Sequence, residues 1–146
     1  FLDIVIPSLT DPTVAPPGKH VISIFVQYAP YHLKEGAAQW PAKREALGDT
    51  VVDTLAEYCP NLKDSILHRQ VVTPWDLEQE VGLTEGNIFQ GELSLEQLGP
   101  FRPVSGWSRY QAPIDQLWMC GSCVHPGGGI MGAPGELAVK SLLKSR

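Results

Sequence analysis

The chain has 146 residues, and its 11 lysines and arginines against 16 aspartates and glutamates give a net charge of −5. This balance disfavours nonspecific nucleic-acid binding, which needs clustered basic side chains to neutralise phosphates. The composition, 43% apolar and 18% charged, predicts one folded domain or a large piece of a bigger one. A membrane span is not expected, because the best apolar stretch, residues 21–33, is too short and contains Gln27, Pro30 and His32.

The chain opens on Phe1 inside the apolar run FLDIVI, without an initiator methionine or a targeting segment. This start indicates a piece cut from a longer polypeptide. Three cysteines, Cys59, Cys120 and Cys123, cannot all pair within one chain, and they do not resemble the disulfide framework of a secreted domain. We therefore expect a reducing, cytoplasmic location, or a mitochondrial one for a eukaryotic source.

Two strands are expected in the first 30 residues. Residues 1–6 are largely apolar and end at Pro7, and residues 21–28 (VISIFVQY) are rich in β-branched and aromatic side chains. Prolines and Gly18 predict a structured loop over residues 7–18, because proline fixes φ and cannot donate to a strand ladder. Both faces of the second strand are largely apolar, which predicts a central position in a sheet.

A helix is expected from Pro41 to Cys59 and Pro60, because proline suits a first helical position and apolar residues then recur at helical spacing. A third strand is predicted over residues 66–73, where β-branched residues return. The side chains expected to form the core-facing stripe of the helix are Leu47, Val51, Leu55 and Tyr58.

Capping signals predict short helices at Thr73-Pro74-Trp75-Asp76 and at Ser94-Leu95-Glu96-Gln97. A turn-rich stretch over residues 100–113 follows. A strand over residues 117–120 and a helix over residues 134–144 are expected to end the chain. The turn-rich stretch either lines a substrate channel or forms a packed connection with snorkelling arginines; its candidate residues are Arg102, Trp107, Arg109 and Tyr110.

Between the last strand and the last helix, six of the fifteen residues 121–135 are glycine. Glycines let a backbone approach a ligand closely, and a helix N-terminus offers unpaired N–H groups and a partial positive charge. The turn lacks the usual dinucleotide fingerprint, which opens a βαβ unit and has an acidic residue about 20 positions later. It predicts a second cofactor contact rather than the first, and the alternative is a turn that only satisfies tight packing.

The segment CGSCVHPGGGIMGAPG resembles the C-terminal flavin-binding segment of phytoene desaturase-like FAD-dependent oxidoreductases. PSLTDPTVAPPGKHV and RPVSGWSRYQAPIDQLWMCGS extend the resemblance over almost the whole chain. It implies an FAD flavoprotein, phytoene dehydrogenase-like or carotenoid desaturase-like, that transfers hydride from a hydrophobic or unsaturated small molecule to flavin. No catalytic side chain is identified, because in such enzymes the cofactor does the chemistry.

The resemblance also implies an α+β fold, with a mixed or antiparallel sheet and covering helices over residues 1–104, as part of a substrate-binding domain. Residues 105–146 would be a C-terminal FAD-binding segment whose strand, glycine-rich turn and helix complete a Rossmann-type domain. That domain's N-terminal part would be the partner of this chain, which alone is expected to be inactive. The implied cofactor-binding residues are Gly121, Ser122, His125, Pro126, Gly127, Gly128, Gly129, Ile130, Met131 and Gly132.

Three alternatives remain open at this stage. Cys120-Gly-Ser-Cys123 has the C-x-x-C spacing of redox and zinc sites, yet further ligands at suitable spacing are missing, so no metal site is predicted and Cys120 is expected to be a buried strand residue. His125 either carries a proton beside a flavin or fixes its loop through a ring hydrogen bond. The whole chain is alternatively a noncatalytic α+β module that binds a ligand or partner and self-associates through exposed apolar faces.

Overall fold

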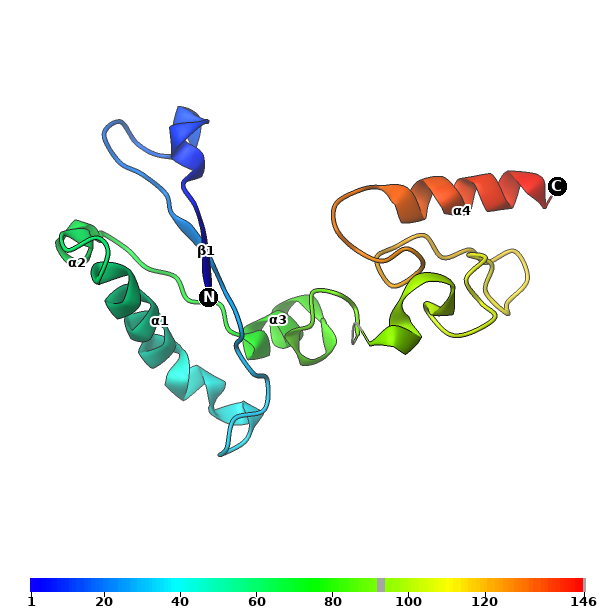
Figure 1. Cartoon of the computed structure of the whole chain (residues 1–146), viewed down its shortest axis with the longest axis horizontal. Helices are drawn as coiled ribbons and strands as arrows, with labels where there is room; N and C mark the ends of the chain where they lie inside the picture. Colours follow the sequence, from blue (N-terminus) through cyan, green and yellow to red (C-terminus); the bar gives the residue numbers. More distant parts are fainter. Residues whose placement is uncertain (92–93, 146) are drawn as a thin grey trace. The chain divides into compact units, whose positions relative to one another are not determined.

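A computed structural model describes residues 1–91 and 94–145. The chain divides into two compact units, Phe1–Asp76 and Leu77–Arg146, which we call the first unit and the second unit. The described residues contain one two-stranded antiparallel sheet and four α-helices, which agrees with the predicted α+β class (Figure 1). None of the helices in this described part is long and apolar enough to cross a membrane.

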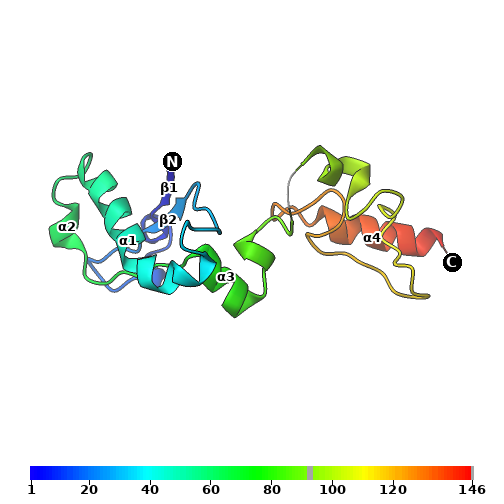
Figure 2. The same ribbon diagram turned by 90° about the horizontal axis from the view of Figure 1, so that it is seen from below.

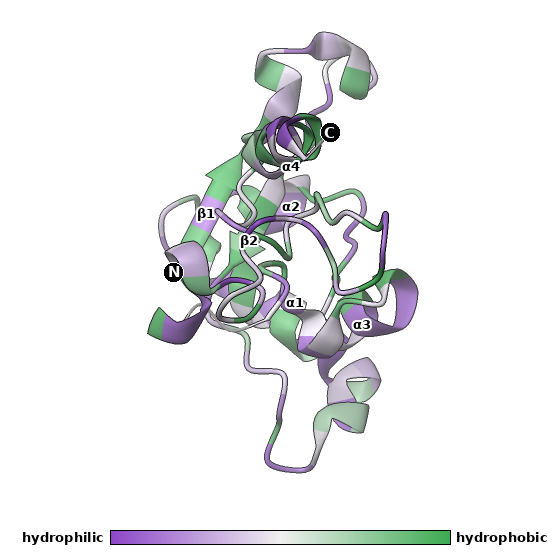
Figure 3. Ribbon diagram, turned by 90° about the vertical axis from the view of Figure 1, so that its right-hand side faces the viewer, coloured by the Kyte–Doolittle hydropathy of each residue, from purple (hydrophilic) through white to green (hydrophobic). Residues whose placement is uncertain are grey.

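The sheet of the first unit is a hairpin of β1 (Leu2–Val5) and β2 (Ser23–Val26), in which Leu2 lies opposite Val26 and Val5 opposite Ser23. Both strands were predicted, although each is shorter than expected. The central position predicted for β2 is wrong, because β2 pairs only with β1 among the described residues. Its apolar side chains are instead half exposed, and both strands are coloured mainly as hydrophobic in Figure 3.

The loop that joins the two strands is ordered, as predicted. It contains the 3₁₀ turns Pro7–Leu9 and Pro12–Val14, each with a proline in its first positions. Asp11 caps the second turn by accepting a hydrogen bond from the Thr13 N–H at 3.0 Å. The buried Ser8 hydroxyl accepts a hydrogen bond from the Val21 N–H at 3.1 Å and contacts Nδ1 of His20 at 3.0 Å, so it fixes the return of the chain into β2.

Helix α1 (Trp40–Ala56) begins where Pro41 predicted it. Val51 is buried and Leu47 and Leu55 are partly buried, which agrees with the predicted stripe. Tyr58 is a wrong assignment, because the helix ends two residues before it and its side chain is 79% exposed. The short helix α2 (Leu62–Ser65) follows.

The strand predicted over residues 66–73 does not form among the described residues. This segment instead follows α1 through side-chain contacts, with Arg69 paired to Glu45 at 2.5 Å and to Asp49 at 2.7 Å. Gly48 of α1 permits this approach, because a Cβ atom there would lie 2.7 Å from Cγ2 of Val71. Residues 66–73 have strand-forming composition but lack the neighbouring strand that a ladder requires.

Helix α3 (Pro74–Val81) confirms the predicted capping signal. The Thr73 N–H and hydroxyl each donate to Oδ2 of Asp76 at 2.7 Å, and the Asp76 N–H donates back to the Thr73 hydroxyl at 3.3 Å. Arg44 of α1 pairs with the other carboxylate oxygen. Burial alone raises the pKa of Asp76, but the hydrogen bonds from Thr73 and Arg44 outweigh it and hold that pKa below its ordinary value.

The second unit is mostly turns and irregular chain. The helix predicted at Ser94 is a single 3₁₀ turn, Leu95–Gln97, without a capping bond from the Ser94 side chain, and a similar turn, Gly99–Phe101, follows. The strand predicted over residues 117–120 is wrong, because the described part of this segment makes only an isolated bridge, between Gln111 and Trp118. Two backbone hydrogen bonds flank this bridge, from the Ala112 N–H to the Leu117 carbonyl oxygen at 2.9 Å and from the Met119 N–H to the Tyr110 carbonyl oxygen at 2.8 Å, and the pairing does not extend into a ladder.

Helix α4 (Ala133–Lys144) is the last element of the described chain, as predicted, and it directly follows the glycine-rich turn (Figure 2). Ala138 of α4 forms a small core with Tyr110 and the fully buried Val124. The core therefore fixes the helix against the stretch that leads into the turn. The residues that pack around these three are Trp118, Met119, Cys123 and Leu137.

Candidate functional site

The glycine-rich turn and the start of α4 enclose an open hollow of about 260 Å³, which we call the glycine hollow. Eight of the ten predicted site residues line it, and Cys120, Pro134 and Gly135 complete the lining. His125 and Pro126 do not line it. The eight predicted residues are Gly121, Ser122, Gly127, Gly128, Gly129, Ile130, Met131 and Gly132.

The shape of the hollow depends on glycine. Gly127, Gly129 and Gly132 have φ angles of 107°, 133° and 68°, which side-chain-bearing residues rarely adopt. A Cβ atom on Gly129 would lie 3.0 Å from Cε of Met131, and one on Gly128 would lie 3.4 Å from Cβ of Ser122. The turn is therefore a closely packed backbone structure that other residue types would distort.

Helix α4 presents its N-terminus to the glycine hollow. Gly132 is its N-cap residue, and the Gly132 carbonyl accepts the first helical hydrogen bond, from the Glu136 N–H at 3.2 Å. No side chain of the described residues caps this terminus, so its unpaired N–H groups and partial positive charge remain available to a ligand. The exposed apolar side chains of Ile130 and Met131 border the same space. The hollow thus combines a weakly positive end with an apolar border.

His125 lies outside the glycine hollow, and its ring nitrogen Nδ1 makes a 2.7 Å hydrogen bond to the carbonyl oxygen of Gly99. A hydrogen bond from the ring is what we expected if His125 fixes its loop, which was one of the two alternatives for this residue. Pro126 follows directly and is exposed. The structure therefore places these two predicted residues outside the hollow, and His125 connects its loop to the backbone of Gly99.

Arg102 and Tyr110 form part of a packed connection, one of the two alternatives for the turn-rich stretch. Arg102 is 1% exposed and donates to three backbone carbonyl oxygens, so it is wholly buried rather than snorkelling. Burial raises the pKa of the Tyr110 hydroxyl above its ordinary value. Trp107 and Arg109 are exposed. No local motif distinguishes the buried arginine from the exposed one, which is why the sequence did not separate them.

The cysteines of the C-x-x-C pair are both free, with Cys120 exposed and Cys123 partly buried. The prediction of Cys120 as a buried strand residue is wrong, because no strand forms there and its side chain borders the glycine hollow. No group of three or more histidine, cysteine or acidic side chains is close enough to hold a metal within the described residues.

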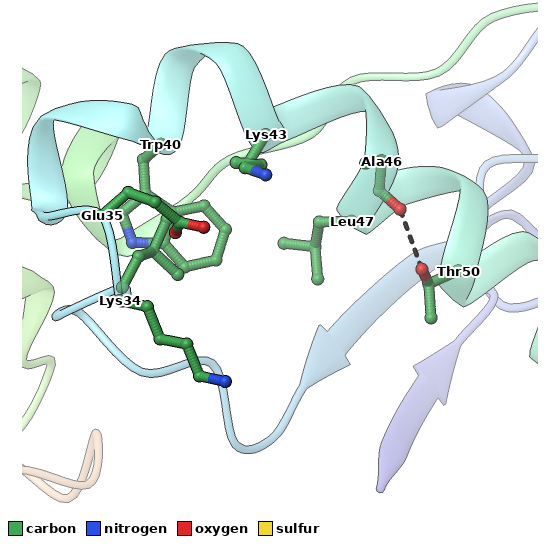
Figure 4. Close-up of a pocket in the computed structure, with 8 residues that line it drawn as sticks. Lys34, Glu35, Trp40, Lys43, Ala46, Leu47 and Thr50 are labelled. Carbon is green, nitrogen blue, oxygen red and sulfur yellow. Dashed lines mark hydrogen bonds between the residues drawn. The ribbon is translucent and has the colours of Figure 1, made fainter.

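A second hollow, of about 350 Å³, lies in the first unit beside the start of α1. Trp40, Ala46 and Leu47 contribute apolar surface, and the Trp40 indole N–H is already satisfied by the carbonyl oxygen of Tyr31 at 3.0 Å. None of the predicted site residues contributes to this hollow, and its exposed charges have both signs. Its remaining lining residues are Leu33, Lys34, Glu35, Lys43 and Thr50 (Figure 4).

Comparison with known proteins identifies the relatives of this chain. Pyridine nucleotide-disulfide oxidoreductase domain-containing protein 2 of Rattus norvegicus is 47% identical over 138 residues, which cover 94% of the chain and 24% of that protein. The lycopene-forming phytoene desaturase of Pseudescherichia vulneris is 32% identical over 127 residues, covering 86% and 25%. A limonene dehydrogenase component of Castellaniella defragrans is 31% identical over 140 residues, covering 90% and 25%.

The chain spans about a quarter of the length of these relatives. No protein-family model matches the chain, and no solved structure matches it. The similarity to named proteins nevertheless extends over most of the chain, as the resemblance in the sequence predicted. The chain is therefore homologous, over most of its own length, to a part of phytoene desaturases and of pyridine nucleotide-disulfide oxidoreductase domain-containing protein 2.

Proposed function

We propose that this chain is the C-terminal portion of an FAD-dependent oxidoreductase. Residues 1–104 belong to its substrate-binding domain, and residues 105–146 complete an FAD-binding domain whose Rossmann part precedes them. The observation that carries this proposal is the glycine hollow, in which eight residues of the flavin-like segment come together at the N-terminus of α4. The chain alone is inactive in this proposal, because most of the cofactor's binding surface belongs to the rest of the protein.

The residues of the glycine hollow fit an FAD group. Its lining has no charged side chain, and its turn is held in a shape that requires glycine. Gly127, Gly128 and Gly129 let the backbone pass close to a flat ring. The backbone N–H groups of Ile130, Met131 and Gly132 would face the pyrimidine end of the flavin, and Gly121 and Ser122 would lie nearer the ribityl chain and pyrophosphate.

The bound FAD supplies hydride acceptance, and the chain supplies positioning and electrostatics. The positive end of α4 favours negative charge that develops near it. The backbone of the turn lies close to Ser122 and to Arg102, because Cβ atoms on Gly128 and Gly127 would stand 3.4 Å and 3.2 Å from these side chains. His125 keeps its loop in place through Gly99 rather than exchanging protons with a substrate.

The proposed substrate is a hydrophobic or unsaturated small molecule. Two relatives are named for phytoene and limonene, and the exposed Ile130 and Met131 give the hollow an apolar border that such a molecule would contact. Among the described residues that line the hollow, none has a charged side chain that would contact an ionic substrate directly. An apolar substrate is therefore the class that this border suits.

Purification of the whole protein that contains this chain tests the proposal. The expected result is a yellow protein with flavin absorbance bands that bleach when a hydrophobic unsaturated substrate is added without oxygen. Reconstitution of the colourless form with FAD serves as the second arm. A whole protein that remains colourless and takes up no FAD in reconstitution contradicts the proposal.

A noncatalytic module is the second candidate, and the exposed apolar side chains of the first unit favour it. Leu9, Tyr28 and Tyr58 are each more than 60% exposed, and the hairpin has no further strand on either edge among the described residues. This candidate predicts self-association of the chain. Size-exclusion chromatography with light scattering distinguishes the two, since a monomer argues against it.

A further inference from the structure

Arg102 is the most completely buried charged side chain of the described residues. Its guanidinium is positive at physiological pH, yet only 1% of the residue is exposed. Nε donates to the carbonyl oxygen of Cys123 at 3.3 Å, and Nη2 donates to the carbonyl oxygens of Gln90, at 3.0 Å, and Phe89. One side chain therefore connects residues 89–90 to the start of the glycine-rich turn.

The same guanidinium lies against the backbone that lines the glycine hollow. A Cβ atom on Gly127 would stand 3.2 Å from Nη1 of Arg102, so glycine allows this approach. The Gly127 N–H donates to the carbonyl oxygen of the fully buried Val124 at 2.8 Å, which closes the turn over residues 124–127. Arg102 thus contacts the turn at Cys123 and approaches it again at Gly127.

The charge of Arg102 differs from that of the paired arginines of the first unit. Arg44 pairs with Asp76, and Arg69 pairs with two carboxylates on α1. Among the residues that the structure describes, no carboxylate forms an ion pair with Arg102. Carbonyl dipoles solvate this charge without cancelling it, and a charge in a protein interior is only weakly screened from the groups beside it, here the backbone at Cys123 and Gly127.

From these contacts we infer that Arg102 is a positioning residue for the proposed flavin site. It fixes the turn at Cys123 and Gly127, and its charge favours an anionic group in the glycine hollow. Because reduced flavin carries more negative charge than oxidised flavin, the arginine raises the midpoint potential of the bound cofactor. This inference rests on the proposed function and adds a residue that does not itself line the hollow.

Two substitutions in the whole protein separate the geometric and electrostatic parts. Arg102→Met removes the carbonyl contacts and the charge, while Arg102→Lys keeps the charge on a side chain without the planar fork that binds several carbonyls at once. Lys144→Met removes an exposed positive charge from the second unit and is the matched control. The measurements are the dissociation constant of FAD, the midpoint potential of the bound flavin, and circular dichroism as a check of folding.

We expect Arg102→Met to weaken FAD binding at least tenfold and to disfavour the reduced form about tenfold, which is about 30 mV for a two-electron couple. Arg102→Lys is expected to weaken binding at least fivefold with less than half of that change in potential. Lys144→Met should leave both quantities within twofold of the unchanged protein. If Arg102→Met does not fold, the FAD affinity and flavin potential of Arg102→Lys alone test the inference.

Two results overturn the inference. One is a folded Arg102→Met protein whose FAD affinity and flavin potential both remain within twofold of the unchanged protein. The other is an Arg102→Lys protein that binds FAD as the unchanged protein does. Failure of the unchanged protein to bind FAD at all would instead remove the proposed function, so the two failures are distinguishable.

Discussion

The two units of the chain are organised by different interactions. In the first unit, the hairpin of β1 and β2 forms a regular ladder, and ion pairs connect α1 to Arg69 and to Asp76. In the second unit, mostly irregular chain is held by a small core around Val124 and by the buried Arg102, whose hydrogen-bond partners among the described residues are backbone carbonyl oxygens. The candidate site lies in the irregular unit, where backbone conformation rather than regular structure determines its shape.

Because of this difference, we expect substitutions to change stability by different amounts in the two units. Solvent screens exposed ion pairs, so their loss costs little, whereas a turn that requires glycine and buried groups tolerates almost no change. Changes in the second unit should therefore have the larger effects, and changes in the first unit the smaller ones. All substitutions are made in the whole protein.

Gly127→Val is expected to have the largest effect. At a φ of 107°, any Cβ atom is strained, and here it would also lie 3.2 Å from Nη1 of Arg102. We expect a loss of about 2 kcal/mol or more in the free energy of unfolding, and loss of FAD binding. Denaturant unfolding and flavin titration measure both. Gly135→Ala is the matched control for the free energy of unfolding only, because no atom lies within 4 Å of its Cβ position in α4 and alanine favours a helix, whereas Gly135 itself lines the glycine hollow. Equal losses for the two variants would contradict the prediction.

Val124→Ala should follow in size. Val124 is fully buried and packs in the core with Tyr110 and Ala138. Removing two methyl groups from such a site is expected to lower the free energy of unfolding by about 2 kcal/mol. Val139→Ala on the exposed side of α4 is the control, with a change expected within about 0.5 kcal/mol. If both variants unfold at the same denaturant concentration, this core does not hold the second unit.

Asp76→Asn should produce a smaller, pH-dependent loss in the first unit. The folded-state pKa of Asp76 lies below its ordinary value, so its carboxylate stabilises the fold above the ordinary pKa, near pH 4. That contribution is lost as the pH falls through the folded-state pKa. At pH 7 we expect Asp76→Asn to cost about 1 kcal/mol through the cap of α3 and the contact with Arg44.

Unfolding curves recorded from pH 7 to pH 2 check this prediction. The difference in stability between the unchanged protein and Asp76→Asn should shrink as the pH falls below about 4, because Asp76 then becomes protonated in the unchanged protein. Asp3→Asn, which alters an exposed carboxylate on β1, is the control and should show no such convergence. A difference that is constant with pH would mean that the charge of Asp76 does not contribute.

Arg69→Gln should have the smallest effect. Its two partners, Glu45 and Asp49, are mostly exposed on α1, so water and salt screen both pairs. We expect a small decrease in the unfolding midpoint at low salt that disappears at about 1 M sodium chloride. A large decrease that persists in salt would show that Arg69 acts by packing against Gly48 rather than by its charge.

Local signals in the sequence located α1, α3 and α4, whereas the short helix α2 was not predicted. Pro41 and the apolar stripe located α1, the Thr73 and Asp76 pair located the start of α3, and the residues after Gly132 predicted α4. These signals act within one or two helical turns, so the sequence alone carries them. Eight predicted residues of one segment likewise line the glycine hollow together, because they are neighbours along the chain.

Tertiary structure decided the rest. Residues 66–73 and 117–120 have strand-forming side chains, but a strand needs a partner with free ladder positions, and neither segment has a paired strand among the described residues. Whether a side chain is buried also depends on distant segments of the chain. Arg102 is buried, whereas Tyr58 and Cys120 are exposed. The residue type indicates whether a side chain is usually buried or exposed. A charged side chain can be buried only where the fold brings carbonyl groups from elsewhere in the chain around it.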